Sequence, residues 1–348
     1  SGNFQFAPIK YTVAGTYTYT IKEKTPSGVL GVTDDITEYD VVVTAIDDTV
    51  GKLHITSVLV NGQEHVAKNE TVEGDFSFKF NFINIYKANG EFDVDAEIGV
   101  TKKLEAGGRL LKVDEFSFTL SSEDDLDNAM QTAKNAADGT VSFAKLLYDE
   151  ADIGKTYTYK VVENIPADAD KEAGMTYSSN ILAFKVTVTD NGDGTLTTTK
   201  TMVSGETEFV NKYEADGEFD VDAEIGVTKK LEAGGRLLKA DEFSFTLSSE
   251  DDLDNATQTV KNAADGTVSF ANLVYDETDI GKTYTYKVVE NIPADADKET
   301  GMSYSTNILS FKVTVTDAGN GVLNTAKKMV SGETEFVNKY EADGEFDV

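Results

Sequence analysis

The stretch GEFDVDAEIGVTKKLEAGGRLLK at residues 90–112 occurs again, letter for letter, at residues 217–239. Around it, residues 91–217 and 218–344 are the same 127-residue text with about 16 differences, and both copies close with ETEFVNKYEADG. Residues 1–86 read as the back half of a third, more diverged copy. A fixed period of this length is typical of an array of whole domains rather than of one large enzyme.

The repeat predicts where the domains lie. We expect the C-terminal half of a first domain at residues 1–87, complete domains at 88–214 and 215–344, and the start of a further repeat at 345–348. SGNFQF at the start of the chain aligns with DGTVSF at residues 138–143, so the first domain is expected to lack its front strands. The sequence is therefore interpreted as a piece of a longer array.

Composition excludes several classes of partner. Lys and Arg total 31 against 62 Asp and Glu, a formal net charge of -31, which repels nucleic acid and anionic membranes. The absence of cysteine excludes disulfides and thiolate metal sites, and no apolar run is long enough to span a bilayer. We therefore expect no nucleic-acid partner and no membrane insertion. With 19 Phe and 15 Tyr, the chain has enough apolar material for folded cores.

Alternation of apolar and polar residues predicts strands throughout the middle copy. The inward face of the first strand carries Ile98, Val100, Lys102 and Leu104. Further segments that we expect to form strands are EFSFTL, VSF, YTYKVVE, ILAFKVTVTD, TLTTTKTMV and TEFVNKY. Seven or so short strands, about ten residues apart, favour an all-β, Ig-like sandwich. The one candidate helical turn lies within Leu126–Ala136.

Short, acidic linkers join the domains. YKANGEFDV and YEADGEFDV run straight into the next first strand. A short linker leaves little freedom between neighbours, so we expect an elongated rod of tandem domains.

Three polar residues fall on strand faces that should point inward. Lys102 shares its face with Val100, Glu163 lies on the inward face of YTYKVVE, and Asn211 lies on that of TEFVNKY. The third domain repeats the set as Lys229, Glu290 and Asn338. Burial of a lone amine or carboxylate is expensive, so these groups need partners or a neutral form.

One reaction uses such a trio. A desolvated lysine loses its proton and becomes a nucleophile, and a carboxamide is its electrophile. A desolvated, protonated glutamate polarises the amide and moves protons. Ordinary interpretations stay open from spacing alone: the lysine could snorkel, the glutamate could be an exposed strand end, and the asparagine could bond edge backbone.

The diverged first domain keeps part of the same set. AGTYTYTIKE places Glu23 where the second domain has Glu163, and FNFINIY places Asn84 where it has Asn211. Its lysine would lie in the front half that the chain does not include. The first domain is a more independent observation than the third, because its text has drifted far from the others.

These motifs resemble a known family. VTKKLEAGGRLLKADEFSFTL, NAADGTVSF, GKTYTYKVVE, FKVTVTDNGDGTL and TEFVNKY are similar to the pilin isopeptide-linkage domains, CnaB-type Ig-like modules of Gram-positive backbone pilins and repetitive adhesins. The resemblance covers both full copies and the half copy. It implies bonds between the first-strand lysine and the last-strand asparagine, catalysed by the glutamate. The residues it assigns are Lys102–Asn211 with Glu163, Lys229–Asn338 with Glu290, and the partial set of Glu23 and Asn84.

The resemblance also implies a role and a place. We expect a structural stalk on a Gram-positive cell surface, in a cell wall or a pilus, with neighbouring repeats as partners and no cofactor. Sortase-linked pilus subunits or cell wall are the further partners that it implies for the parent protein, although the chain has no LPxTG-like signal. The alternative is an adhesin that recognises host protein or glycan through its loops. An enzyme acting on an external substrate is disfavoured, because no nucleophile motif, metal cluster or phosphate loop is seen.

Other polar features carry weaker hypotheses. TDNGDGTL at residues 189–196 resembles a calcium loop, but a plain hairpin turn is favoured. Asp93 and Asp95 in the linker could hold calcium, but solvated acidic residues are favoured. His54 and His65 lack a matching ligand set. The long loop ENIPADADKEAGMTYSSN at residues 163–180 could contact either a partner or the next domain.

Overall fold

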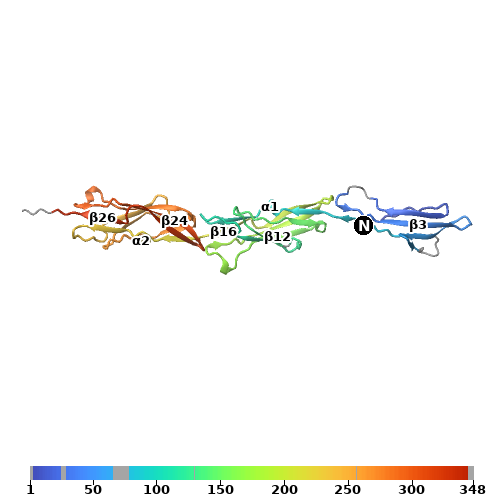
Figure 1. The fold of residues 1–348 in the computed structure, drawn as a ribbon, viewed down its shortest axis with the longest axis horizontal. Coiled ribbons are helices and arrows are strands. Elements are labelled where there is room, and N and C mark those ends of the chain that lie inside the picture. The colour runs from blue at the N-terminus through green and yellow to red at the C-terminus, as the bar shows by residue number, and fades with distance from the viewer. Residues whose placement is uncertain (1–2, 25–28, 66–77, 129, 256, 344–348) are drawn as a thin grey trace, which may run out of the picture.

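Three β-rich bodies lie end to end along one axis, and together they form a rod (Figure 1). This is a computed structural model, and it describes residues 3–24, 29–65, 78–128, 130–255 and 257–343. The first body, in blue, occupies one end, the second lies in the middle, and the third occupies the other end. The expected all-β tandem sandwich and its rod-like arrangement are confirmed. The predicted start of a further repeat at residues 345–348 lies outside the described residues.

Each body contains short strands and very little helix. The first contains β1 Gly15–Lys22, β2 Val32–Thr33, β3 Glu38–Asp47, β4 Leu53–Val60, β5 Gln63–His65 and β6 Ile85–Tyr86. The second contains β7 Asn89–Phe92, α1 Val94–Glu97, β8 Thr101–Glu105, β9 Ser117–Ser122, β10 Met130–Lys134, β11 Leu146–Asp149, β12 Thr156–Glu163, β13 Met175–Thr176, β14 Ile181–Asp190, β15 Leu196–Ser204 and β16 Glu208–Tyr213. The third contains β17 Asp216–Phe219, α2 Val221–Glu224, β18 Thr228–Glu232, β19 Ser244–Ser249, β20 Gln258–Lys261, β21 Leu273–Asp276, β22 Thr283–Glu290, β23 Met302–Ser303, β24 Ile308–Gly319, β25 Val322–Ser331 and β26 Glu335–Tyr340.

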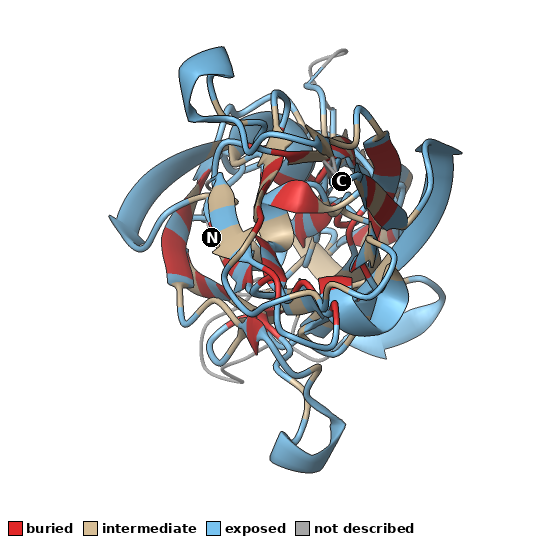
Figure 2. Cartoon of the chain, turned by 90° about the vertical axis from the view of Figure 1, so that its left-hand side faces the viewer, coloured by how far each residue is buried: buried red, intermediate tan, exposed pale blue. Residues whose placement is uncertain are grey.

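Two sheets enclose the core of the second domain. One has the strand order β10-β9-β12-β14-β15, and the other has the order β13-β16-β8. Side chains that alternate inward from both sheets are fully buried, among them Phe118, Tyr159, Phe184 and Phe209. Figure 2, which looks along the rod, shows buried strand faces inside and exposed strands and loops around them.

The first and last strands of the domain are direct neighbours. β8 pairs in parallel with β16, so that Lys102 lies opposite Phe209 and Leu104 lies opposite Asn211. The third domain repeats this with β18 and β26. Parallel pairing fits a sandwich whose chain enters through its first strand and leaves through its last strand in the same direction.

The linker is part of the fold, and this corrects the interpretation of a solvated acidic connector. β7 pairs antiparallel with β11, and Phe92 and Val94 are buried. Asp93 caps α1 by accepting a hydrogen bond from the backbone N–H of Ala96 at 3.0 Å. The apolar residues of GEFDV are therefore anchored in the domain that follows, which shortens the free connection between domains.

Two local predictions were wrong. Leu126–Ala136 contains strand β10 rather than a helical turn, because Met130–Lys134 pairs with β9 at the edge of the sheet. VSF at residues 141–143 is not a regular strand. The backbone N–H of Phe143 donates to Asp95 Oδ1 at 2.9 Å. This N–H therefore bonds to a carboxylate and not to the backbone of a neighbouring strand.

The first domain has one face of its core uncovered. Its sheet has the order β1-β3-β4-β5, and Val41, Val43 and Val58 form a small buried cluster. Tyr19 and Ile21 are only half-buried, and beside them is an apolar hollow of about 410 Å³. No strand equivalent to β8 or β9 covers this face among the residues that the structure describes.

The buried amide of Asn135 supplies a test of the fold. Its Oδ1 accepts from Phe116 N at 2.7 Å, and its Nδ2 donates to the carbonyls of Lys112 at 2.8 Å and Ala136 at 2.9 Å. Asn135→Ala should lower the free energy of unfolding of the second domain by about 2–4 kcal/mol, because it removes three hydrogen bonds and leaves the buried N–H of Phe116 without its partner. Calorimetry would measure the loss.

A control comes from Asn164, whose side-chain bonds to Thr119 and Ser117 are exposed. Water replaces exposed hydrogen bonds, so Asn164→Ala should cost less than about 0.5 kcal/mol. Equal losses in the two variants would contradict the role given to Asn135.

Candidate functional site

The structure brings Lys102, Glu163 and Asn211 together in the core of the second domain. Lys102 Nζ donates to Glu163 Oε2 at 2.8 Å, and Asn211 Nδ2 donates to Glu163 Oε1 at 2.7 Å. The lysine and the asparagine come from the neighbouring strands β8 and β16, and the glutamate comes from β12 in the facing sheet. One carboxylate therefore holds both the amine and the carboxamide.

The polar side chains of this cluster are shielded from solvent. The side chain of Lys102 is 0% exposed and that of Glu163 is 1% exposed. The lysine Nζ lies 4.5 Å from the centroid of the Phe116 ring. Burial lowers the pKa of Lys102, while the hydrogen bond and the charge of Glu163 oppose this shift. The lowered pKa favours the neutral amine, which is the nucleophilic form.

The third domain repeats the arrangement. Lys229 Nζ donates to Glu290 Oε2 at 2.8 Å, and Asn338 Nδ2 donates to Glu290 Oε1 at 2.6 Å. Burial lowers the pKa of Lys229 as well. The two domains are almost identical in sequence, so this agreement is expected.

The first domain holds two of the three groups. Asn84 Nδ2 donates to Glu23 Oε1 at 2.8 Å, as in the complete domains. Glu23 Oε2, which corresponds to the oxygen that accepts from lysine elsewhere, is buried and has no hydrogen-bond partner in the part of the chain that the structure describes. The glutamate–asparagine contact therefore persists although the surrounding sequence has diverged.

A backbone donor completes each site, and the sequence analysis missed it. The N–H of Ser178 donates to Asn211 Oδ1 at 2.7 Å, and the N–H of Ser305 donates to Asn338 Oδ1 at 2.7 Å. In the first domain, the N–H of Asp35 donates to Asn84 Oδ1 at 2.8 Å. Any residue except proline can supply a backbone N–H, so no side-chain pattern could have identified these positions.

The acidic linker and hairpin residues have structural partners. Asp95 accepts from Phe143, and the capping bond of Asp93 was described above. In the hairpin, Asp190 Oδ1 accepts from Gly192 N at 2.9 Å. Among the described residues there is no group of three His, Cys, Asp or Glu side chains placed to hold a metal ion.

The two histidines lie apart from the three sites. His54 Nε2 lies 3.0 Å from Asp48 Oδ2, and His65 packs edge-on against Phe78. In the described part of the chain, no helix is long and apolar enough to cross a membrane.

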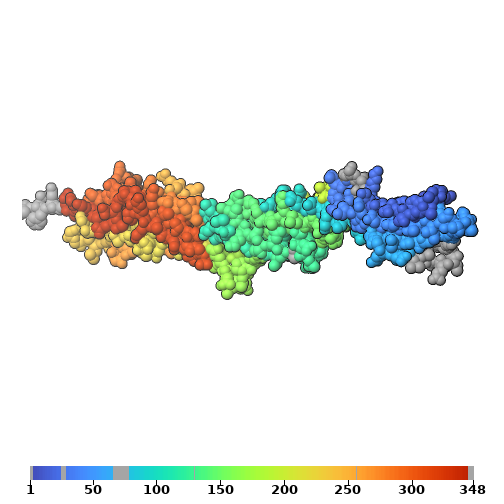
Figure 3. Space-filling view, turned by 45° about the vertical axis from the view of Figure 1, so that its right-hand side comes forward, coloured from blue at the N-terminus to red at the C-terminus, as the bar shows by residue number. Residues whose placement is uncertain are grey.

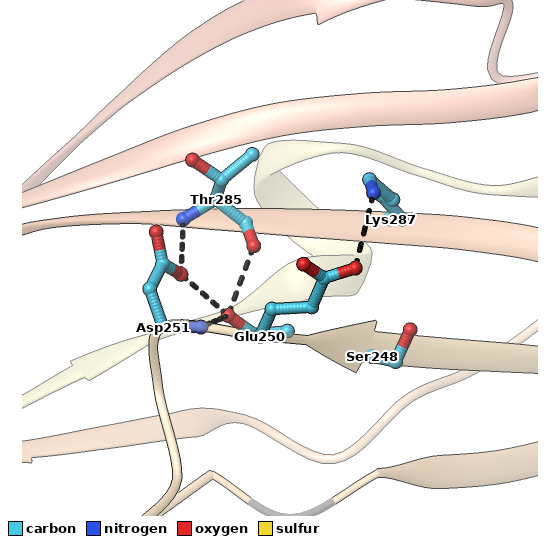
Figure 4. A pocket seen from close by; sticks show the side chains of 6 residues that line it. Ser248, Glu250, Asp251, Thr285 and Lys287 are labelled. Carbon is cyan, nitrogen blue, oxygen red and sulfur yellow. Dashed lines mark hydrogen bonds and ion pairs between the residues drawn. The ribbon is translucent and has the colours of Figure 1, made fainter.

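A surface hollow of about 230 Å³ lies on the outer face of the third domain (Figure 4). Its polar groups bond to one another: Asp251 Oδ1 accepts from Thr285 N at 2.9 Å, and Lys287 Nζ lies 3.6 Å from Glu250 Oε1. The hollow is smaller than most ligand sites, which begin at about 300 Å³. We interpret these contacts as polar links between the end of β19 and strand β22, and we do not assign a ligand to the hollow.

The chain matches the family model of the FctA, Spy0128-like isopeptide containing domain, at residues 1–87, 98–214 and 225–341. No curated protein matches it.

Solved structures with some likeness include the major pilin of Streptococcus pyogenes, at 16% identity and a TM-score of 0.25, covering 73% of this chain and 98% of that one. The T-13 major pilin of the same species is 14% identical with a TM-score of 0.26, covering 74% of this chain and 97% of that one. The pilus adhesin SpaC of Lactobacillus rhamnosus GG is 10% identical with a TM-score of 0.20, covering 97% of this chain and 55% of that one. At these TM-scores the assignment rests on the family match alone.

The matched segments take up most of the chain and contain all three glutamate–asparagine pairs. The chain therefore belongs to the family of FctA, Spy0128-like isopeptide-containing domains and carries three of them in tandem.

Proposed function

We propose that the chain is a stalk segment of a Gram-positive surface pilus or adhesin, stiffened by self-catalysed bonds between Lys102 and Asn211 and between Lys229 and Asn338. The observation that carries the proposal is the buried carboxylate of Glu163, which contacts the lysine amine at 2.8 Å and the asparagine carboxamide at 2.7 Å. Glu290 makes the same two contacts in the third domain.

The reaction follows from these contacts. Lys102 transfers a proton to Glu163, and its neutral Nζ attacks Cγ of Asn211. Glu163 then protonates the departing Nδ2. As the Nζ–Cγ bond forms and the Cγ–Nδ2 bond breaks, Nζ gives its second proton to Glu163 and one ammonia leaves. Glu163 therefore ends with the proton that the lysine ammonium brought to the site. Each domain reacts once, which makes the bond a step of maturation rather than an enzymatic turnover.

The backbone N–H of Ser178 suits the developing charge. As Nζ attacks Cγ, the carboxamide oxygen gains negative charge, and the Ser178 N–H already donates to that oxygen at 2.7 Å. A donor fixed before the reaction stabilises such an oxyanion without reorganisation. The dry surroundings strengthen this interaction and the contacts of the glutamate.

The bond would change the path of a pulling force. β8 follows the entry linker and β16 precedes the exit linker, so a link between Lys102 and Asn211 carries tension directly between the two ends of the domain. The intervening strands are then outside the path. The link also closes a loop of just over 100 residues, which stabilises the fold by about 4–5 kcal/mol in the chain-entropy model for cross-links.

This function fits the surroundings implied by the family. A chain without cysteine gains a covalent staple that reductants do not cleave. A net charge of -31 keeps an exposed rod soluble. The partners we propose are neighbouring repeats and, in the parent protein, pilus subunits or cell wall joined by sortase.

The intact mass of the denatured chain is the first test. Each bond releases one ammonia, so two bonds should lower the mass by about 34 Da relative to the sequence, by the amide displacement described above. Lys102→Arg should halve this deficit, because a guanidinium keeps its charge and does not attack. Lys103→Arg, at the exposed neighbour, should leave the deficit unchanged. A mass equal to that of the plain sequence would contradict both bonds.

Glu163→Ala tests the catalyst. It should abolish the bond of the second domain only, so the mass deficit should fall to about 17 Da while the third domain stays linked. The thermal transition of the second domain should fall sharply, because the cross-link is lost and Lys102 is buried without its carboxylate. Glu290→Ala is the matched variant and should affect only the third domain.

Two results would remove the glutamates from the mechanism. One is an unchanged deficit of about 34 Da in both variants, and the other is an unchanged thermal profile in both. Mass spectrometry reads the bond even in a variant whose fold is weakened, so the test does not depend on full stability.

A further inference from the structure

The junction between the second and third domains is a built contact rather than a bare linker. Tyr213, at the end of β16, donates its hydroxyl to Asp317 Oδ1 of the next domain at 2.8 Å. The same hydroxyl accepts from Gly321 N at 3.0 Å. Asp317 and Gly321 belong to the hairpin that joins β24 to β25, which forms part of the leading end of the third domain. Figure 3 shows the two domains packed against each other without a gap.

Arg109 brings a buried charge to this junction. Its guanidinium lies 4.3 Å from the centroid of the Tyr213 ring and bonds to Glu172 at 3.0 Å. Its side chain is 6% exposed, yet Nε and Nη1 find no hydrogen-bond partner among the described residues. Asp317 Oδ2 of the next domain lies 3.8 Å from Nε. Glu115 and Glu172 of its own domain already pair with Arg109, and Asp317 adds a third carboxylate beside Nε.

A glycine pair allows the backbones to approach. Gly108 N donates to the carbonyl of Glu277, in the next domain, at 2.9 Å. A Cβ built on Gly107 would lie only 2.2 Å from the same carbonyl oxygen. The corresponding residue of the third domain, Gly234, has the same φ of +54°, and a Cβ there would meet nothing within 4 Å. The docked neighbour is therefore what excludes a side chain at position 107.

The first junction uses the same contact with a different sequence. Tyr86 donates to Asp190 Oδ1 at 2.6 Å, and Gly194 N donates to the Tyr86 hydroxyl at 3.2 Å. The first domain has diverged far from the others, so its tyrosine is an independent instance. A tyrosine at the trailing end of one domain thus meets an aspartate hairpin at the leading end of the next at both junctions.

The trailing face of the third domain is already assembled. We define this face by Arg236, Tyr340, Gly234, Gly235 and Gly301. The guanidinium of Arg236 lies 4.6 Å from the centroid of the Tyr340 ring and bonds to Glu299 at 2.9 Å. Among the described residues, no leading hairpin lies against this face.

We propose that the trailing face of the third domain is a docking surface for the leading hairpin of another copy of this repeat, with the hairpin aspartate as the group it recognises. Continuity with the two existing junctions identifies the occupant. Arg236, which pairs with Glu242 and Glu299, holds the place that Arg109 has at the second junction. The contact fixes neighbouring domains in one orientation, so the rod is rigid between domains as well as within them. This inference does not depend on the isopeptide bonds.

Matched glycine variants test the contact in the chain as it is. Spin labels are placed on cysteines introduced at Thr199 and Ala326, equivalent exposed positions of β15 and β25 in a chain that has no other cysteine. Gly107→Ala should widen the distance distribution between the labels at least about twofold, because the next domain must move away. Gly234→Ala has the same backbone conformation, and its added Cβ meets no atom of the described residues within 4 Å, so it should leave the distribution unchanged.

A second pair separates docking from any loss of fold. Tyr213→Phe keeps the ring over Arg109 but removes the hydroxyl bonded to Asp317, and should shift the docked-to-undocked ratio about tenfold towards undocked. Tyr340→Phe is the same change without a docked neighbour and should have no effect. Circular dichroism and the intact mass check that each variant domain is folded and linked.

The free face is tested by lengthening the chain with one more copy of residues 217–343, placed after Asp343 so that the linker stays in register. Labels at Ala326 and at its equivalent in the added repeat should give a distribution as narrow as that of the existing junction. Gly234→Ala and Tyr340→Phe, silent before, should now widen it. The docking surface would be overturned by a broad distance distribution in the lengthened chain that neither variant changes. It would also be overturned if the distance distribution of Gly107→Ala stayed narrow.

Discussion

Burying an amine, a carboxylate and a carboxamide in one dry core is the constraint on which the rest of each complete domain depends. An ion pair enclosed this way gains little net stability, because desolvation offsets most of the attraction. The cluster of Lys102, Glu163 and Asn211 is tolerated because Glu163 accepts from both other side chains and because the buried Phe116 and Phe118 lie around it. The same desolvation lowers the pKa of Lys102 and so favours the neutral amine that the proposed bond requires.

The sandwich topology determines how a bond between Lys102 and Asn211 would change the mechanics of the domain. β8 and β16 are parallel neighbours, so the chain enters and leaves the domain along two strands that lie side by side. A covalent link between adjacent entry and exit strands shortens the force path to a few residues. With the proposed bond in place, the five-stranded sheet would supply the glutamate and its buried surroundings and would lie outside the path of the force. The first domain, which has Glu23 and Asn84 but an uncovered apolar face, shows how much of the site the back half alone maintains.

Stiffness within domains is useful to a stalk only if the connections are stiff too. Phe92 and Val94 of the linker are buried in the domain that follows, which leaves few free residues between neighbours. Tyr213, Arg109 and Asp317 then join the domain ends through a hydroxyl, a guanidinium and a carboxylate. Polar contacts of this kind are directional, so they fix an orientation more sharply than an apolar patch of equal area would.

The sequence by itself determined the period, the all-β class and the inward phase of Lys102, Glu163 and Asn211, because alternation along a strand is a local property that one strand displays on its own. It misjudged the short elements: Met130–Lys134 became an edge strand through pairing with β9, and GEFDV became anchored through β11. Only the tertiary structure decided that one carboxylate bridges the other two groups, that the Ser178 backbone faces the asparagine oxygen, and that Gly107 lies against the next domain. These contacts join residues far apart in the chain, several of them through backbone atoms that carry no sequence signature.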